Sequence, residues 1–140
     1  MVKFLSLLTL LLFCMIGQGF AQETSVPKKN SLDEFNRARE LAFAGNREEA
    51  RSICYEILNQ NPKFFDARIL IGRTYGWDKN FQPGRVELQL VLDEDFDNSD
   101  AIFAMIDIEK WAGDPNKAIF YCEYGLSFFP NEEAFLVQKV

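Results

Sequence analysis

The sequence contains no histidine among its 140 residues. Histidine is the side chain that most often serves as a general base near neutral pH, and it is also the commonest metal ligand. A catalytic site would therefore have to use carboxylates, Lys, Tyr or Cys alone. The sequence also lacks a Gly-rich phosphate-binding loop and the G-x-S-x-G motif that presents a nucleophilic serine. We therefore expect a protein that is not an enzyme and that holds no cofactor and no metal.

Basic residues are in the minority. The sequence has 15 Lys and Arg against 21 Asp and Glu, which gives a formal net charge of −6 at pH 7. A chain with this charge is repelled by the phosphates of nucleic acids and by anionic lipid surfaces. Nucleic acid is therefore not an expected partner.

Long apolar runs are absent except near the start. Residues 4–16 form a charge-free and mostly apolar run that follows Lys3 and precedes Gly19 and Ala21. Small residues at those two positions are what a signal peptidase reads, and the run is shorter than the roughly 20 residues of a membrane span. We predict that residues 1–21 are a signal peptide, with an uncleaved membrane anchor as the alternative. Residues 22–30 are expected to form a linker.

From Ser31 onward the apolar residues have a helical period. They recur three and four positions apart, as in Ile53, Ile57 and Leu58. Turn signals separate the apolar runs, for example Gly45-Asn46 and Asp97-Asn98-Ser99. This pattern predicts a series of short helices joined by tight turns.

The helical region also repeats itself. Gly45 to Ala50 reads GNREEA, and Gly113 to Ala118, 68 positions later, reads GDPNKA. Trp77 and Trp111 lie 34 positions apart, which is half of that spacing. A period of 34 residues is typical of helix-turn-helix repeats that stack into a solenoid. We predict an all-α solenoid of antiparallel helix hairpins over residues 31–140, with repeats at 31–64, 65–98 and 99–132 and a partial fourth repeat at 133–140.

The recurring spacing of Gly, Ala and Pro resembles the pattern of the tetratricopeptide repeat family. That pattern places Gly at the turn, Ala in the second helix and Pro at its end. The outer copies have these residues at Gly45, Ala50 and Pro62, and again at Gly113, Ala118 and Pro130. The middle copy has Gly84 in place of Ala, and glycine inside a helix is less favourable by about 1 kcal/mol. We therefore expect the middle hairpin to be the least stable.

A more particular resemblance comes from residues 66–77, which read DARILIGRTYGW, and from Trp111-Ala112-Gly113. These segments resemble the N-terminal repeats of YaiO-type outer-membrane β-barrel proteins, in which a signal peptide precedes the repeats and a barrel follows them. The resemblance implies an exported scaffold that acts in the periplasm or on the periplasmic face of the outer membrane. This sequence has no series of alternating strand patterns, so association with that membrane would require a missing C-terminal barrel or a partner. Similar repeats occur in exopolysaccharide export proteins, which implies polysaccharide handling as the alternative function.

The family resemblance also implies a partner-binding groove, because the first helices of tetratricopeptide repeats line a concave surface. Carried over onto this sequence, it gives three rows of residues: Phe43, Trp77 and Trp111; Arg39, Arg73 and Asp107; and Phe35, Ile69 and Phe103. Aromatic and Arg side chains are enriched in binding hot spots. The expected binding residues are Arg39, Phe43, Arg73, Trp77, Asp107 and Trp111, with packing between repeats as the alternative role of the aromatic ones. The two arginines would suit a carboxylate of a peptide or an acidic sugar.

Two other groups of residues are interpreted as structural. Cys54 and Cys122 occupy the same position two repeats apart, which separates them by roughly 20 Å, whereas a disulfide needs Cα atoms within about 7 Å. We expect both to be buried core residues. The segment Asp93 to Asn98 begins like a calcium loop, but Asn98 and Ala104 stand where such a loop has Gly and Glu. A turn between repeats is the expected role.

The end of the sequence predicts one more property. The helix expected from residue 133 begins a hairpin whose second helix is not in the sequence, so an apolar face would be uncovered there. Solenoids normally cover such a face with a polar capping helix. We therefore expect self-association through this open helix.

Overall fold

The computed structural model describes residues 30–138, and all of its regular elements there are helices. The predicted signal peptide, nearly all of the linker and the last two residues lie outside the described part. In chain order the helices are α2 (Ser31–Phe43), α3 (Arg47–Gln60), α4 (Phe65–Trp77), α5 (Phe81–Glu94), α6 (Ser99–Trp111), α7 (Pro115–Phe128) and α8 (Glu133–Gln138). Within residues 30–138 no helix is both long and apolar enough to cross a membrane.

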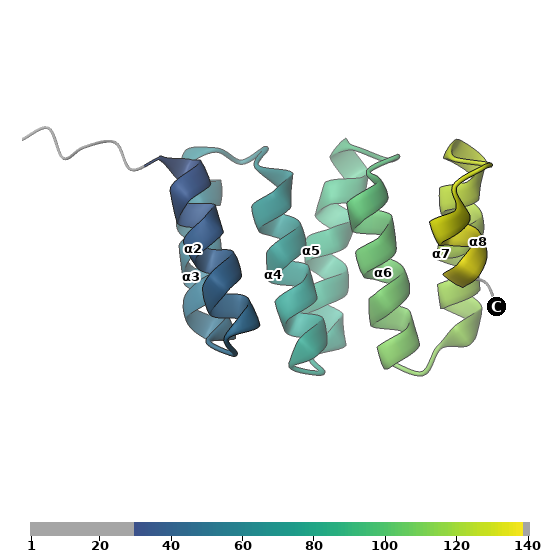
Figure 1. Ribbon diagram of the computed structural model, residues 1–140, viewed down its shortest axis with the longest axis horizontal. Coiled ribbons are helices and arrows are strands. Elements are labelled where there is room, and N and C mark those ends of the chain that lie inside the picture. Colours follow the sequence, from purple (N-terminus) through teal and green to yellow (C-terminus); the bar gives the residue numbers. More distant parts are fainter. Residues whose placement is uncertain (1–29, 139–140) are drawn as a thin grey trace, which may run out of the picture.

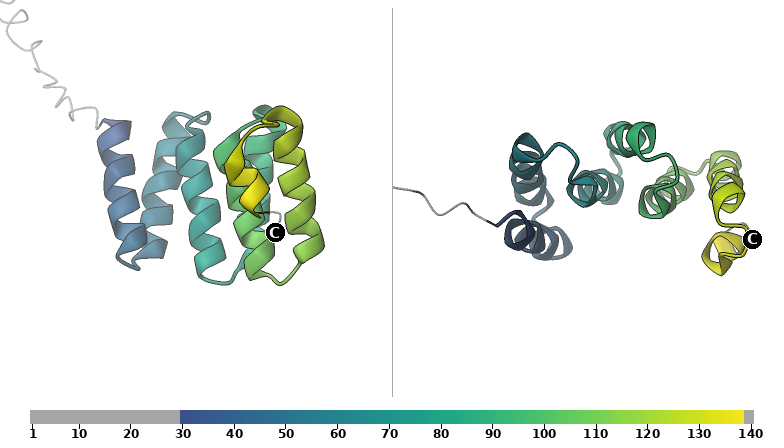
Figure 2. Two further views of the ribbon diagram at one scale, coloured as in Figure 1. Left: turned by 45° about the vertical axis from the view of Figure 1, so that its right-hand side comes forward. Right: turned by 90° about the horizontal axis from the view of Figure 1, so that it is seen from above.

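The helices form two rows. The helices α2, α4, α6 and α8 begin at intervals of 34 residues, and so do α3, α5 and α7. Figure 1 shows the hairpins stacked side by side, and the view from above in Figure 2 separates an inner row (α2, α4, α6, α8) from an outer row (α3, α5, α7). The predicted all-α solenoid of antiparallel hairpins is confirmed.

The helix ends follow from local chemistry. The side chains of Asn98 and Asp114 accept hydrogen bonds from backbone N–H groups of α6 and α7, and Pro115 occupies the first turn of α7. Asn98 thus caps a helix, in agreement with the expected turn between repeats. The hairpin turns place Gly45 and Gly113 at φ 94° and 75°, a region open to glycine without strain. Lys79 has the equivalent position in the middle hairpin at φ 60°, where a side chain is unfavourable by roughly 1–2 kcal/mol.

The core consists of small residues where helices cross and of aliphatic residues around them. Ala50 and Ala118, the expected contact points within the outer hairpins, are buried. Cys54 and Cys122 are buried in two different core clusters and form no disulfide with each other, as predicted. Burial raises the pKa of the Cys54 thiol to about 12, which makes this thiol unreactive at neutral pH.

Gly84 has a packing role that its sequence position did not reveal. A Cβ atom added to Gly84 would lie 2.9 Å from the backbone oxygen of Gly72 and 2.8 Å from Cδ1 of Ile108. The two glycines therefore allow α4 and α5 to approach backbone to backbone, while α6 closes over the contact. Interpreting Gly84 only as a weakened copy of Ala missed this close contact.

Replacing Gly84 with Ala is expected to lower the free energy of unfolding by about 1–3 kcal/mol, the usual range for overpacking. Helix propensity alone predicts the opposite, a gain of about 1 kcal/mol. Chemical denaturation followed by circular dichroism measures the difference. Ala118→Gly, at the equivalent position of α7, is the matched control and should also destabilise, by about 1 kcal/mol. A Gly84→Ala protein more stable than the parent would show that the close contact is unimportant.

Candidate partner-binding groove

A hollow of about 440 Å³ opens on the inner row of helices. It lies mainly between α2 and α4, and one residue of α6 reaches its edge. Its lining combines aromatic, aliphatic and charged side chains: Phe35, Arg39, Phe43, Asp66, Ile69, Leu70, Arg73, Trp77 and Asp100. A hollow of this size accommodates a few side chains of a partner rather than a whole element.

Helix periodicity explains why these residues meet. On α4 the lining residues Ile69, Arg73 and Trp77 are spaced four apart, so they lie along one face of the helix. Phe35 and Phe43 lie 34 positions before Ile69 and Trp77, and they line the facing side of the hollow on α2. The repeat therefore builds the groove by placing the same helix face in two neighbouring hairpins.

The aromatic end of the groove is a shelf of two rings. The rings of Phe43 and Trp77 lie 5.5 Å apart, inclined by 40°, and Phe43 is 71% exposed. The guanidinium of Arg47 lies 5.9 Å from the centre of the Trp77 ring, a cation–π contact that helps to hold the indole in place. The shelf thus presents apolar surface to the solvent without depending on a ligand for its shape.

The two arginines of the groove differ in their surroundings. Arg73 donates to the Asp107 carboxylate at 3.0 Å and to the backbone oxygen of Asp100 at 3.5 Å. The guanidinium of Arg39 lies 5.9 Å from the Phe35 ring, and the structure pairs it with no carboxylate of residues 30–138. Arg39 is therefore the groove cation whose donors stay available to a partner.

The six residues expected to bind a partner do not all meet. Arg39, Phe43, Arg73 and Trp77 line the hollow, whereas Asp107 and Trp111 do not. Asp107 forms the ion pair with Arg73. Trp111 is 45% exposed but covers Gly76, where an added Cβ would lie 2.9 Å from its ring.

Sequence reasoning also missed part of the lining. Asp66 and Asp100 border the hollow and lie 34 positions apart, so the repeat period was a signal that could have identified them. Phe103, in the third predicted row, stacks on Phe135 at 4.1 Å and does not line the hollow. For Phe103 packing between repeats is therefore the observed role.

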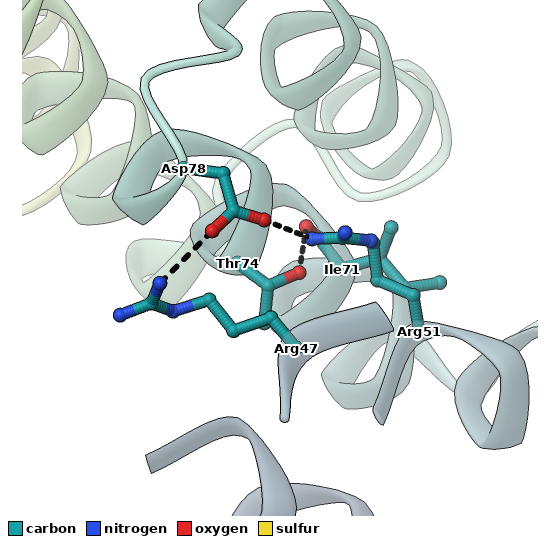
Figure 3. Close-up of polar contacts among 5 residues, drawn as sticks. All are labelled: Arg47, Arg51, Ile71, Thr74 and Asp78. Atoms are coloured by element: carbon teal, nitrogen blue, oxygen red, sulfur yellow. Dashed lines mark hydrogen bonds and ion pairs between the residues drawn. The ribbon is translucent and has the colours of Figure 1, made fainter. Parts of the chain in front are cut away.

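A polar network lies next to Trp77, at the end of α4 (Figure 3). The Asp78 carboxylate, one residue after Trp77, accepts hydrogen bonds from Arg47 at 2.9 Å and from Arg51 at 2.7 Å. Partial burial opposes ionisation of Asp78, but the two arginines outweigh it and hold the pKa of this carboxyl below its usual value. The network joins α3 to the end of α4, so it helps to set the position of Trp77, the residue before Asp78.

Comparison with known proteins identifies the fold. No family model matches the sequence, and neither does any curated protein. Among solved structures, the chain is similar to a tetratricopeptide repeat protein from Parabacteroides merdae ATCC 43184, with a TM-score of 0.69 and 21% sequence identity. The similarity covers 79% of this chain and 43% of that one, so this chain spans less than half of the length of its structural neighbour. The likeness confirms a tetratricopeptide-type fold and leaves the YaiO-type resemblance as a prediction.

Proposed function

We propose that this tetratricopeptide-type solenoid is a protein-interaction module, and that its groove binds a segment of a partner polypeptide. One observation supports this more than any other: Arg39, without a carboxylate partner among the described residues, lies in the same hollow as the exposed shelf of Phe43 and Trp77. Such a site offers a planar donor for a carboxylate next to apolar surface for an adjacent side chain. The expected ligand is a peptide with an acidic residue close to an aliphatic or aromatic one.

The test is a comparison of two neighbouring arginines. Peptides are selected from a displayed random library against the chain, and their affinities are measured by fluorescence polarisation. Arg39→Ala is expected to weaken binding at least tenfold, because a hydrogen bond to a charged group contributes about 1.5–3 kcal/mol. Arg37→Ala is the matched control, since Arg37 pairs with Glu49 and does not line the hollow. Equal affinities for the parent and the Arg39→Ala variant would contradict the proposal.

The alternative is binding of an acidic polysaccharide. It is favoured by the position of Trp77 in the hollow and by the exposure of Trp111, since indole rings stack on sugar rings. The two tryptophans are the only ones in the sequence, so intrinsic fluorescence reports on them directly. Quenching by uronic acid oligosaccharides, with no peptide recovered from the library, would replace the peptide proposal by this alternative.

We further propose that the module is exported and acts in the periplasm, as the interaction arm of an outer-membrane barrel protein. The support is the signal-like run of residues 4–16 and the resemblance of residues 66–77 to YaiO-type proteins. Cell fractionation followed by intact mass measurement of the native product is the test. A product much longer than 140 residues in the outer membrane is expected; a cytoplasmic product that retains residues 1–21 would contradict both statements.

A further inference from the structure

The outer row of helices has an exposed aromatic surface of its own. Four rings follow one another along α7 and into the turn between α5 and α6, and together they form what we name the aromatic ridge: Phe120, Tyr124, Phe128 and Phe96. Consecutive ring centroids are 6.4, 5.1 and 5.5 Å apart. Phe120 is 58% exposed and Phe96 is 60% exposed. On the neighbouring outer helix α5, Val86 and Leu90 are also exposed, 34 positions before Phe120 and Tyr124.

The repeat fold does not require aromatic residues at these positions. In the first repeat, 68 positions earlier, the residues that correspond to Phe120, Tyr124 and Phe128 are polar and exposed: Ser52, Glu56 and Gln60. The ridge is nevertheless held in a fixed shape, because the Tyr124 hydroxyl donates to the backbone oxygen of Phe96 at 2.8 Å. A fixed apolar surface in contact with solvent is characteristic of an interaction site.

The charges around the ridge define the partner. Phe96 lies inside the acidic segment Asp93–Asn98, which contributes four carboxylates. Lys63 approaches Glu94 at 3.6 Å, while Asp93 and Asp95 receive hydrogen bonds from neutral amides. This end of the ridge is therefore negatively charged. The faces of aromatic rings also attract cations, so both features favour a positively charged ligand.

We propose that the aromatic ridge is a second docking surface, distinct from the groove, and that it binds a basic amphipathic segment of a partner protein. The apolar face of that segment packs on Phe120 and its neighbours, and its Lys or Arg side chains lie against the acidic segment around Phe96. An anionic membrane and a second copy of this chain fit less well, because the same carboxylates would repel the lipid and the chain itself has a net charge of −6.

The experiment uses the purified chain and labelled peptides of one length. The first is made of Leu and Lys in an amphipathic helical order, the second has the same composition in scrambled order, and the third has Glu in place of Lys. Fluorescence polarisation is expected to show at least tenfold tighter binding of the first peptide than of either other one. The combined substitutions Phe96→Ser and Phe120→Ser should remove that preference, while Phe43→Ser in the groove leaves it unchanged. Both ridge residues are exposed, and thermal unfolding verifies that the variant remains folded.

A second variant tests the electrostatic part separately. Asp93→Asn combined with Asp97→Asn keeps the rings and is expected to weaken the first peptide several-fold and to reduce the dependence of its affinity on salt. The proposal is overturned if the scrambled peptide binds equally well or if the Phe96→Ser, Phe120→Ser variant keeps full affinity. It is also overturned if the ridge instead mediates binding to phosphatidylserine vesicles, or dimerisation in sedimentation, that the same variant abolishes.

Discussion

Replacing Arg85 with Ala is expected to lower the free energy of unfolding by about 3–5 kcal/mol, the usual effect of removing one partner of a buried ion pair. Arg85 on α5 donates from Nε and Nη2 to the two carboxylate oxygens of Glu109 on α6, both at 2.7 Å. Glu109 is only 1% exposed. Without Arg85 this carboxylate would remain in the interface between two repeats with no compensating charge. The same contact raises the pKa of the Arg85 guanidinium through its hydrogen bonds to Glu109.

Urea denaturation of three variants measures this effect. Arg37→Ala removes an ion pair whose side chains are both 54% exposed, so it should change the stability by less than about 1 kcal/mol. The double variant Arg85→Met, Glu109→Met replaces both charges by apolar side chains and should recover most of the loss. If Arg85→Ala and Arg37→Ala have equal effects, the buried pair does not stabilise the interface as described.

The same interface shows how far the repeat period can be used for prediction. Arg51, 34 positions before Arg85, lies 4.5 Å from the ring of Tyr75, and Tyr75 corresponds to Glu109. The arginine keeps its position in both interfaces, but Arg51 stacks on Tyr75 and donates to Asp78, whereas Arg85 pairs with the carboxylate of Glu109 itself. The period therefore predicted which helices meet and where they begin. It did not predict Glu109 as a buried residue, because charged side chains are expected at the surface unless a partner is known.

The groove residues, like those of the interface, could be predicted only in part. The tetratricopeptide resemblance implied that Arg39, Phe43, Arg73 and Trp77 lie on one concave face, and the structure places all four around the hollow. It could not show that Asp107 pairs with Arg73, because that depends on the distance between neighbouring helices. Arg39 and Arg73 occupy the same position in successive repeats, so the sequence could not show that their pairing with carboxylates differs. Whether a repeated side chain is available to a partner is decided by the side chain opposite it, which the period does not specify.

The last helix offers a second large effect. Phe135 on the short helix α8 is fully buried. Its ring lies on Gly125 of α7, where an added Cβ would be 2.6 Å from its Cε1 atom, and it stacks on Phe103 of α6 at 4.1 Å. One aromatic side chain thus joins α8 to both helices of the preceding hairpin. Phe135→Ala should therefore weaken the docking of α8 by about 3 kcal/mol, the lower end of the range for a buried Phe.

Hydrogen exchange distinguishes this local effect from general destabilisation. Amides of α8 and of the end of α7 should lose protection in Phe135→Ala, while those of α2 to α4 keep theirs, because solenoid repeats contact only their neighbours. Leu136→Ala is the matched control on the same helix, since Leu136 is 47% exposed and should change protection little. Uniform loss of protection along the chain, or equal effects of the two substitutions, would contradict the view that Phe135 anchors α8. The expected self-association through the open helix α8 is tested separately by sedimentation of the parent chain, and a monodisperse monomer would contradict it.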